Sequence, residues 1–146
     1  EDFVRILAVC HTIIVDTEKN EDGSEAEGAR LTYNASSPDE LALTNAARYF
    51  GLIFNERDID NKVVVRDERT GKIEKFELLD IIEFTSARKR MTVVVRAEDG
   101  RILCMTKGAD SVIIPRLRTG QEELVKFTEE VLLEEATDGL RTLLLA

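Results

Sequence analysis

One segment of the sequence places an aromatic ring directly before a run of cations. Phe84 is followed by Thr85, Ser86 and Ala87, and then by Arg88-Lys89-Arg90. An aromatic face can stack on a nucleobase, a contact worth about 1–3 kcal/mol per base, and neighbouring cations attract a phosphate chain. The segment therefore indicates a nucleotide site in which Phe84 stacks on the base and Arg88, Lys89 and Arg90 attract the phosphates. A core Phe followed by a solvated basic turn is the alternative interpretation.

A second candidate is the segment Lys107-Gly108-Ala109-Asp110, which follows an expected strand and opens an expected helix. Gly108 would let a ligand approach the backbone, and a helix N-terminus favours an anion. Lys107 would then contact a phosphate or an adenine. A charged strand end with a glycine turn would give the same pattern.

Two further charged residues are candidates. Arg141 follows Gly139 in an otherwise apolar stretch, so its guanidinium needs either a protein carboxylate or a ligand phosphate as its partner. Ser37 and Glu40 have the spacing of a capping box, with Pro38 at the first helical position. Helix initiation alone explains Glu40, although its carboxylate could also accept a hydrogen bond from the amine of a purine.

The histidine and cysteine content argues against a metal site. The chain has one His and two Cys, with neither a CxxC nor an HExxH pattern. Cys10 and Cys104 both lie in apolar stretches, which predicts two buried free thiols in a reducing compartment, with a disulfide as the alternative. His11 is expected to make a local structural contact.

Common phosphate-binding loops do not explain the candidates. Gly23 and Gly28 have the spacing of P-loop glycines, but Ala29-Arg30 follows where a Lys and a Ser or Thr are required. The sequence has no GxGxxG, which argues against a Rossmann site.

The elements that must position these residues are predicted from hydrophobic periodicity, capping residues and turns. Asp99-Gly100 indicates a hairpin turn, and Leu124, Phe127 and Val131 share one face of an acidic helix. The pattern predicts an α+β fold, a twisted antiparallel sheet with helices packed on it. The expected helices are 3–12, for which a strand is the alternative, 37–50, 109–117 and 121–137. The expected strands are 31–34, 52–55, 62–66, 72–84, 91–97, 101–106 and 140–146.

Length and charge narrow the function classes. With 146 residues, of which 43% are hydrophobic, the chain can form one domain with its own core. The 29 acidic residues outnumber the 20 basic ones, which argues against a nucleic-acid partner. No apolar run approaches the roughly 18–20 residues that span a bilayer, and Glu1-Asp2-Phe3 does not begin a signal peptide. The acidic stretch 16–28 is expected to be a mobile loop.

Taken in order, the motifs resemble the nucleotide-binding (N) domain of P-type ATPases over essentially the whole chain. The segments SPDE (37–40), FTSARKRM (84–91) and KGAD (107–110) resemble the type-IV subfamily, the phospholipid flippases, as do CHT (10–12) and GLRT (139–142). The resemblance implies that Phe84 stacks on adenine, that Lys107 and Glu40 line the adenine side, that Arg141 contacts the phosphates, and that Lys89 and Ser86 lie close by.

The same resemblance implies what the rest of the protein supplies. ATP bound here would pass its phosphoryl group to an aspartate in a separate phosphorylation domain, which would also supply most of the Mg²⁺ ligands. The energy of this transfer would drive lipid transport. No Asp-Lys-Thr-Gly-Thr motif occurs in this sequence. We therefore expect a cytosolic domain of an integral membrane protein, with no catalytic or metal-binding residue of its own, that binds ATP in roughly the 0.1–1 mM range, about 4–5.5 kcal/mol.

The expected partners follow from this assignment. They are ATP, the phosphorylation and actuator domains and membrane segments of the parent chain, and an accessory subunit. Two alternatives stay open at this point. One is the corresponding domain of a cation-transporting P-type ATPase, and the other is a non-catalytic module whose acidic segments bind a basic partner.

Overall fold

The computed structural model describes residues 2–16 and 31–146. The acidic loop expected at 16–28 lies outside the described residues, apart from Asp16. Among the described residues, no helix has the length and apolar character needed to cross a bilayer.

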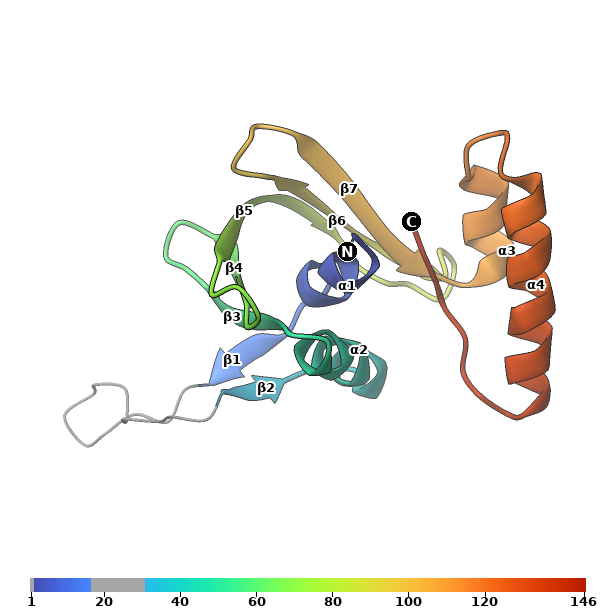
Figure 1. The fold of residues 1–146 in the computed structure, drawn as a ribbon, viewed down its shortest axis with the longest axis horizontal. Helices are drawn as coiled ribbons and strands as arrows, with labels where there is room; N and C mark the ends of the chain where they lie inside the picture. Colours follow the sequence, from blue (N-terminus) through green and yellow to red (C-terminus); the bar gives the residue numbers. More distant parts are fainter. Residues whose placement is uncertain (1, 17–30) are drawn as a thin grey trace.

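A six-stranded antiparallel sheet forms the body of the domain, with its strands in sequence order from β3 to β8. Figure 1 shows β3 to β7 of this sheet. This arrangement confirms the predicted α+β class, because each strand pairs with the next one along the chain. The register shifts by one residue between Phe54 and Glu56 in β3 and between Leu78 and Asp80 in β5, and such bulges increase local twist. The strands are β3 (Leu52–Arg57), β4 (Lys62–Asp67), β5 (Ile73–Ile82), β6 (Arg90–Arg96), β7 (Ile102–Gly108) and β8 (Leu144–Leu145).

The core lies on the concave face of this sheet. Alternate residues of the central strands point to it, as the period of a β-strand requires, including Val63 and Val65 of β4 and Val93 and Val95 of β6. Their side chains are at most 1% exposed. β-Branched side chains pack well on such a surface, which explains why these Val-rich segments form strands.

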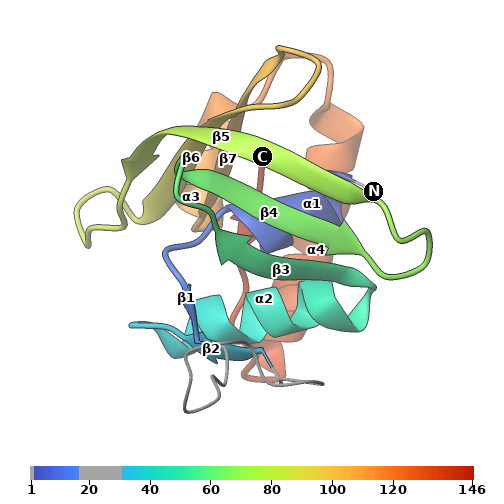
Figure 2. The same ribbon diagram turned by 90° about the vertical axis from the view of Figure 1, so that its left-hand side faces the viewer.

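Two helices cover the core. Helix α1 (Asp2–Val9) lies inside the curve of the sheet against β3 and β4, and α2 (Pro38–Tyr49) packs against α1 and β3 (Figure 2). A short hairpin of β1 (Ile14–Asp16) and β2 (Thr32–Asn34) joins them. The expected helix at 3–12 is confirmed but ends at Val9, and the next residues turn sharply toward α2.

The C-terminal third is more loosely attached. The expected helix at 109–117 is divided into α3 (Asp110–Ile113) and a 3₁₀ turn (Ile114–Arg116) that contains Pro115. Helix α4 (Glu122–Thr137) stands away from the sheet in Figure 1, and none of its residues is buried. Leu124 and Phe127 are 60% and 64% exposed, so the prediction that this helix packs on the sheet is wrong for the described residues.

Two other predictions are corrected by the fold. The final buried strand expected at 140–146 is reduced to Leu144–Leu145, because only the end of β7 lies opposite it. Both cysteines are free, but only Cys10 is buried. Cys104 alternates with the inward-facing Met105 on β7 and is therefore exposed.

Candidate functional site

A pocket of about 670 Å³ opens where β6 and β7 meet α2 and the C-terminal segment. This volume lies within the range of ligand sites in proteins. Five of the six predicted site residues line it, and Ser86 is exposed in the adjacent loop outside the lining. The five residues are Glu40, Phe84, Lys89, Lys107 and Arg141.

Phe84 presents an open aromatic face to this pocket. It lies in the loop between β5 and β6 and is 60% exposed, so the alternative interpretation of a core Phe is wrong. Arg88 holds the loop in place, because its guanidinium donates to the carbonyls of Ile82 and Glu83 at 3.2 and 2.9 Å. The basic run is thus divided: Arg88 is used within the loop, and Lys89 is the cation that lines the pocket.

Gly108 brings the two strand ends together. A Cβ at this position would lie 2.6 Å from Cβ of Arg90 and 2.7 Å from the carbonyl oxygen of Lys89. Lys89 itself has a φ of 51°, and its carbonyl accepts from the N–H of Ala109 at 3.0 Å. The missing side chain of Gly108 therefore makes room for β6, while Gly108 also lines the pocket, so the approach of a ligand to its backbone stays a prediction.

The expected anion site at the start of the 109–117 helix is also wrong. Helix α3 has only four residues, so it has little macrodipole. The carboxylate of Asp110 already accepts from the N–H of Ser111 at 2.6 Å. Lys107 consequently contributes to the pocket through its own ammonium group.

Glu40 does not form the predicted capping box. Ser37 occupies the N-cap position, but its hydroxyl makes no capping hydrogen bond. Glu40 turns inward instead, where Lys107 Nζ lies 3.1 Å from Oε1, and the Thr12 hydroxyl donates to Oε2 at 2.8 Å. Glu40 and Lys107 are each 8% exposed, so this is a buried ion pair on the pocket wall.

The environment of Glu40 keeps its carboxylate ionised. Burial alone would raise its pKa, but the charge of Lys107 and the hydrogen bonds from Thr12 and Lys107 outweigh burial and lower the pKa below its ordinary value. An ionised carboxylate only accepts hydrogen bonds, whereas an ammonium group only donates them. The pair therefore offers an acceptor beside a donor.

The segment Cys10-His11-Thr12 forms the turn after α1 and contacts Glu40 of this pair. Ring atom Nδ1 of His11 accepts from the N–H of Ile13 at 3.2 Å, so Nε2 carries the proton and donates to the Ala8 carbonyl at 3.0 Å. These bonds close the turn after α1 and direct Thr12 toward Glu40. His11 thus has the local structural role expected of it. Thr12 was not among the predicted site residues, because a lone Thr carries no spacing signal.

Arg141 lies at the rim of the pocket. Its guanidinium is 3.1 Å from the carboxylate of Asp39, and its side chain is 84% exposed. Of the two predicted partners, the structure therefore shows the protein carboxylate. An exposed pair of this kind is worth little, so a ligand phosphate can replace Asp39 at small cost.

Metal ligands are not assigned to this pocket. Among the residues that the structure describes, no three His, Cys, Asp or Glu side chains are grouped to hold a metal ion. Asp39 and Glu40 are both engaged by cations. The donor set suits an aromatic base and an anion rather than a bare cation.

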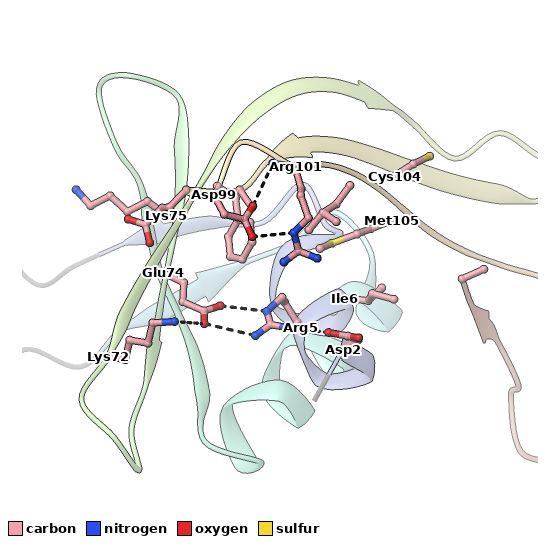
Figure 3. Close-up of a pocket in the computed structure, with 15 residues that line it drawn as sticks. Asp2, Arg5, Ile6, Lys72, Glu74, Lys75, Asp99, Arg101, Cys104 and Met105 are labelled. Atoms are coloured by element: carbon pink, nitrogen blue, oxygen red, sulfur yellow. Dashed lines mark hydrogen bonds and ion pairs between the residues drawn. The ribbon is translucent and has the colours of Figure 1, made fainter.

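A second pocket of about 440 Å³ lies between α1 and the β6–β7 hairpin, on another part of the concave face (Figure 3). Most of its charged residues are paired with each other. Arg5 contacts both Asp2 and Glu74, and Arg101 contacts Asp99 at 2.7 Å. These side chains are already neutralised, and none of the predicted site residues lines this pocket.

Comparison with known families assigns the whole chain to one family. The whole chain, residues 1–146, matches the family model described as P-type ATPase, cytoplasmic domain N. The chain belongs to this family. The resemblance to the P-type ATPase N domain is thereby confirmed, and the antiparallel sheet with its two covering helices is the fold expected for it.

Individual relatives extend the match. The chain is 46% identical over its whole length to a probable phospholipid-transporting ATPase 11 of Arabidopsis thaliana. It is 43% identical over 99% of its length to phospholipid-transporting ATPase 11C of Mus musculus, and 40% identical over 99% to a phospholipid-transporting ATPase of Schizosaccharomyces pombe. The N domain covers only 10–12% of these relatives' lengths.

Proposed function

We propose that this N domain holds ATP for a phospholipid-transporting P-type ATPase. The observation that carries the proposal is the exposed Phe84 ring in the same pocket as Lys89, Lys107 and Arg141. In the proposed complex, adenine stacks on Phe84, its amine faces Glu40, and the phosphates extend toward Lys89 and Arg141. Ser86 approaches the nucleotide from the loop beside the pocket.

The proposal includes the parent protein. ATP held here is delivered to an aspartate in a separate phosphorylation domain, which supplies most Mg²⁺ ligands, and the domain lies on the cytosolic side of a membrane protein. The names of these relatives support a phospholipid substrate, because each is called a phospholipid-transporting ATPase. The actuator domain, membrane segments and an accessory subunit complete the proposed assembly.

The experiment is an NMR titration of the wild-type domain and the Phe84→Ala variant with ATP. We expect a wild-type Kd in the range of about 0.1–1 mM and shifts centred on Phe84, Ser86 and Lys107. Phe84→Ala should weaken binding by about tenfold or more, because base stacking contributes about 1–3 kcal/mol.

A matched control is Phe50→Ala. Phe50 is also an exposed aromatic residue, at 53%, but it lies at the end of α2 outside the pocket. This variant should bind ATP like the wild type. Unchanged affinity in Phe84→Ala would rule out the stacking role, whereas flat spectra for the wild type would favour the acidic interaction module.

A further inference from the structure

One contact on the pocket wall is not explained by folding or by the proposed ATP contacts alone. Thr12 comes from the turn after α1, 28 residues before Glu40, yet both its hydroxyl and its backbone N–H point to the same carboxylate oxygen. The hydroxyl lies 2.8 Å and the N–H 3.4 Å from Oε2. The other oxygen, Oε1, faces Lys107 at 3.1 Å.

We propose that Thr12 is a positioning residue for base recognition. By holding Oε2 of Glu40, it orients Oε1 as an acceptor beside the donor Lys107. This acceptor–donor pair selects adenine over guanine. The inference rests on the proposed function, since it concerns the base of the nucleotide bound there. Thr12, Glu40 and Lys107 all line the pocket. The side chains of Glu40 and Lys107 are each only 10% exposed, and both oxygens of Glu40 accept hydrogen bonds.

The chemistry of the two purines gives the selectivity. Adenine presents an amine donor beside a ring-nitrogen acceptor, whereas guanine presents a carbonyl acceptor in place of the amine. The amine of adenine can donate to the Glu40 carboxylate, and the ring nitrogen beside it can accept from the Lys107 ammonium group. In guanine, the carbonyl oxygen would face the carboxylate oxygen, and two acceptors repel each other.

Without the Thr12 hydroxyl, the Glu40 carboxylate would no longer be held with Oε1 beside Lys107. Oε2 would be a buried acceptor without its hydroxyl partner, a costly situation, so the carboxylate could rotate or take up a proton. The titratable and charged groups that act on Glu40 are Lys107 of β7, Arg57 of β3, and Cys10 and His11 beside Thr12. Of these groups, only Lys107 bonds the carboxylate directly.

The test compares Thr12→Val, which removes the hydroxyl at nearly constant volume, with Thr12→Ser, which keeps it. ATP and GTP are titrated separately into each variant and followed by NMR. We expect the wild type and Thr12→Ser to prefer ATP by about tenfold, which corresponds to one good base contact of about 1.4 kcal/mol. In Thr12→Val the preference should fall below about threefold, mainly through weaker ATP binding.

A second readout distinguishes positioning from a general structural role. The side-chain carboxyl carbon of Glu40 is followed against pH in the same variants. Because the hydroxyl stabilises the charged form, its loss should move the Glu40 midpoint to higher pH in Thr12→Val but not in Thr12→Ser.

Thr44→Val is the matched control. Thr44 lies one turn after Glu40 on α2, is 1% exposed, and its hydroxyl has no hydrogen-bond partner among the described residues. Both the ATP preference and the Glu40 midpoint should stay at wild-type values. If Thr12→Val does not fold, Thr12→Ala replaces it, since alanine removes the hydroxyl and adds no new group.

The outcomes separate this inference from the proposed function. A wild type that binds neither nucleotide overturns both. A wild type that prefers ATP, together with a Thr12→Val variant that keeps the same preference and the same Glu40 midpoint, overturns the role of Thr12 and leaves the ATP site standing.

Discussion

At the residue scale, the candidate site depends on side chains whose roles were only partly readable from their neighbours in sequence. Phe84 and Lys89 have the positions that an aromatic residue before cations predicts, and both line the pocket. Glu40 has a different role from the capping residue that its spacing predicts, because a buried ammonium from β7 is a stronger partner than a helix N–H. The SxxE spacing drew attention to Glu40 as a capping residue, whereas in the structure Glu40 lines the pocket and pairs with Lys107.

His11 gives a testable prediction at this scale. Burial lowers the pKa of its imidazole to about 4, while an unfolded chain has the ordinary value near 6.5. Between these values the unfolded state binds the extra proton, so the free energy of unfolding falls as pH decreases from about 6.5 to 4. The total contribution of this group is about 3 kcal/mol.

Because His11 is the chain's single histidine, its ring protons can be followed directly by NMR. We expect no titration near pH 6.5 and a midpoint near 4. Urea unfolding at pH 7 and pH 4.5 should show the lower stability at the acidic pH. A ring midpoint of about 6.5 would contradict the neutral, buried tautomer.

At the element scale, the approach of β6 to β7 determines where the pocket cations lie. Register pairs Arg90 with Gly108 at the ends of these strands, and the loop that carries Phe84 leads into this pair. The close contact at Gly108 depends on backbone atoms of a strand 18 residues earlier. Such a contact follows from pairing and cannot be derived from the local sequence KGAD.

Gly108→Ala should therefore destabilise the domain by about 2 kcal/mol, because overpacking against backbone typically costs 1–3 kcal/mol. The new Cβ would meet the Lys89 carbonyl, so ATP binding should weaken as well. Urea unfolding and an ATP titration measure the two effects.

Gly71→Ala is the comparison for this prediction. Gly71 has a φ of +71° in the β4–β5 turn, and no heavy atom lies within 4 Å of an added Cβ. Its cost should be about 1 kcal/mol, from backbone conformation alone, with no change in ATP affinity. Equal costs at the two glycines would show that β6 and β7 tolerate the extra carbon.

At the scale of the whole molecule, an acidic chain carries a pocket whose lining charges balance, because Asp39, Glu40 and Glu83 line it together with three cations. The net charge of -9 argued against nucleic acid, but it does not describe the pocket, where Lys89, Lys107 and Arg141 come together. Two of these cations already have carboxylate partners, Glu40 and Asp39. A single nucleotide therefore meets a modest local field, in agreement with the weak binding that we expect.

The domain should bind ATP without turning it over. Phosphoryl transfer requires a nucleophile and Mg²⁺ held in line with the γ-phosphate, and the sequence has no Asp-Lys-Thr-Gly-Thr motif. At 5 mM ATP, the midpoint of thermal unfolding should rise by about 3–5 °C, which follows from a Kd of roughly 0.5 mM. Phosphate should be released no faster than by the hydrolysis of ATP in buffer without protein.

Differential scanning calorimetry and a phosphate assay test these two expectations on one sample. AMP, which keeps the base but lacks the β- and γ-phosphates, serves as the control ligand and should also raise the midpoint if stacking dominates. Phosphate release above background from the purified domain would contradict the assignment of no catalytic residue.

The sequence by itself determined most of the strand and helix pattern, the order of the motifs and five of the residues that line the pocket. Periodicity and turn chemistry act over a few residues, so β4, β6, β7 and α2 were predictable, as was the family. It could not determine how far the C-terminal segment pairs or whether the face of α4 is covered, since only a neighbour in space can bury a face.

Only the tertiary structure decided which side chains bond to each other on the pocket wall. Glu40 and Lys107 are 67 residues apart, and Thr12 reaches Glu40 from a third element. Each of these residues has several possible partners, and the partner is selected when packing removes water from the site. Burial makes an unpaired charge expensive, so the fold that brings these groups together also assigns their bonds.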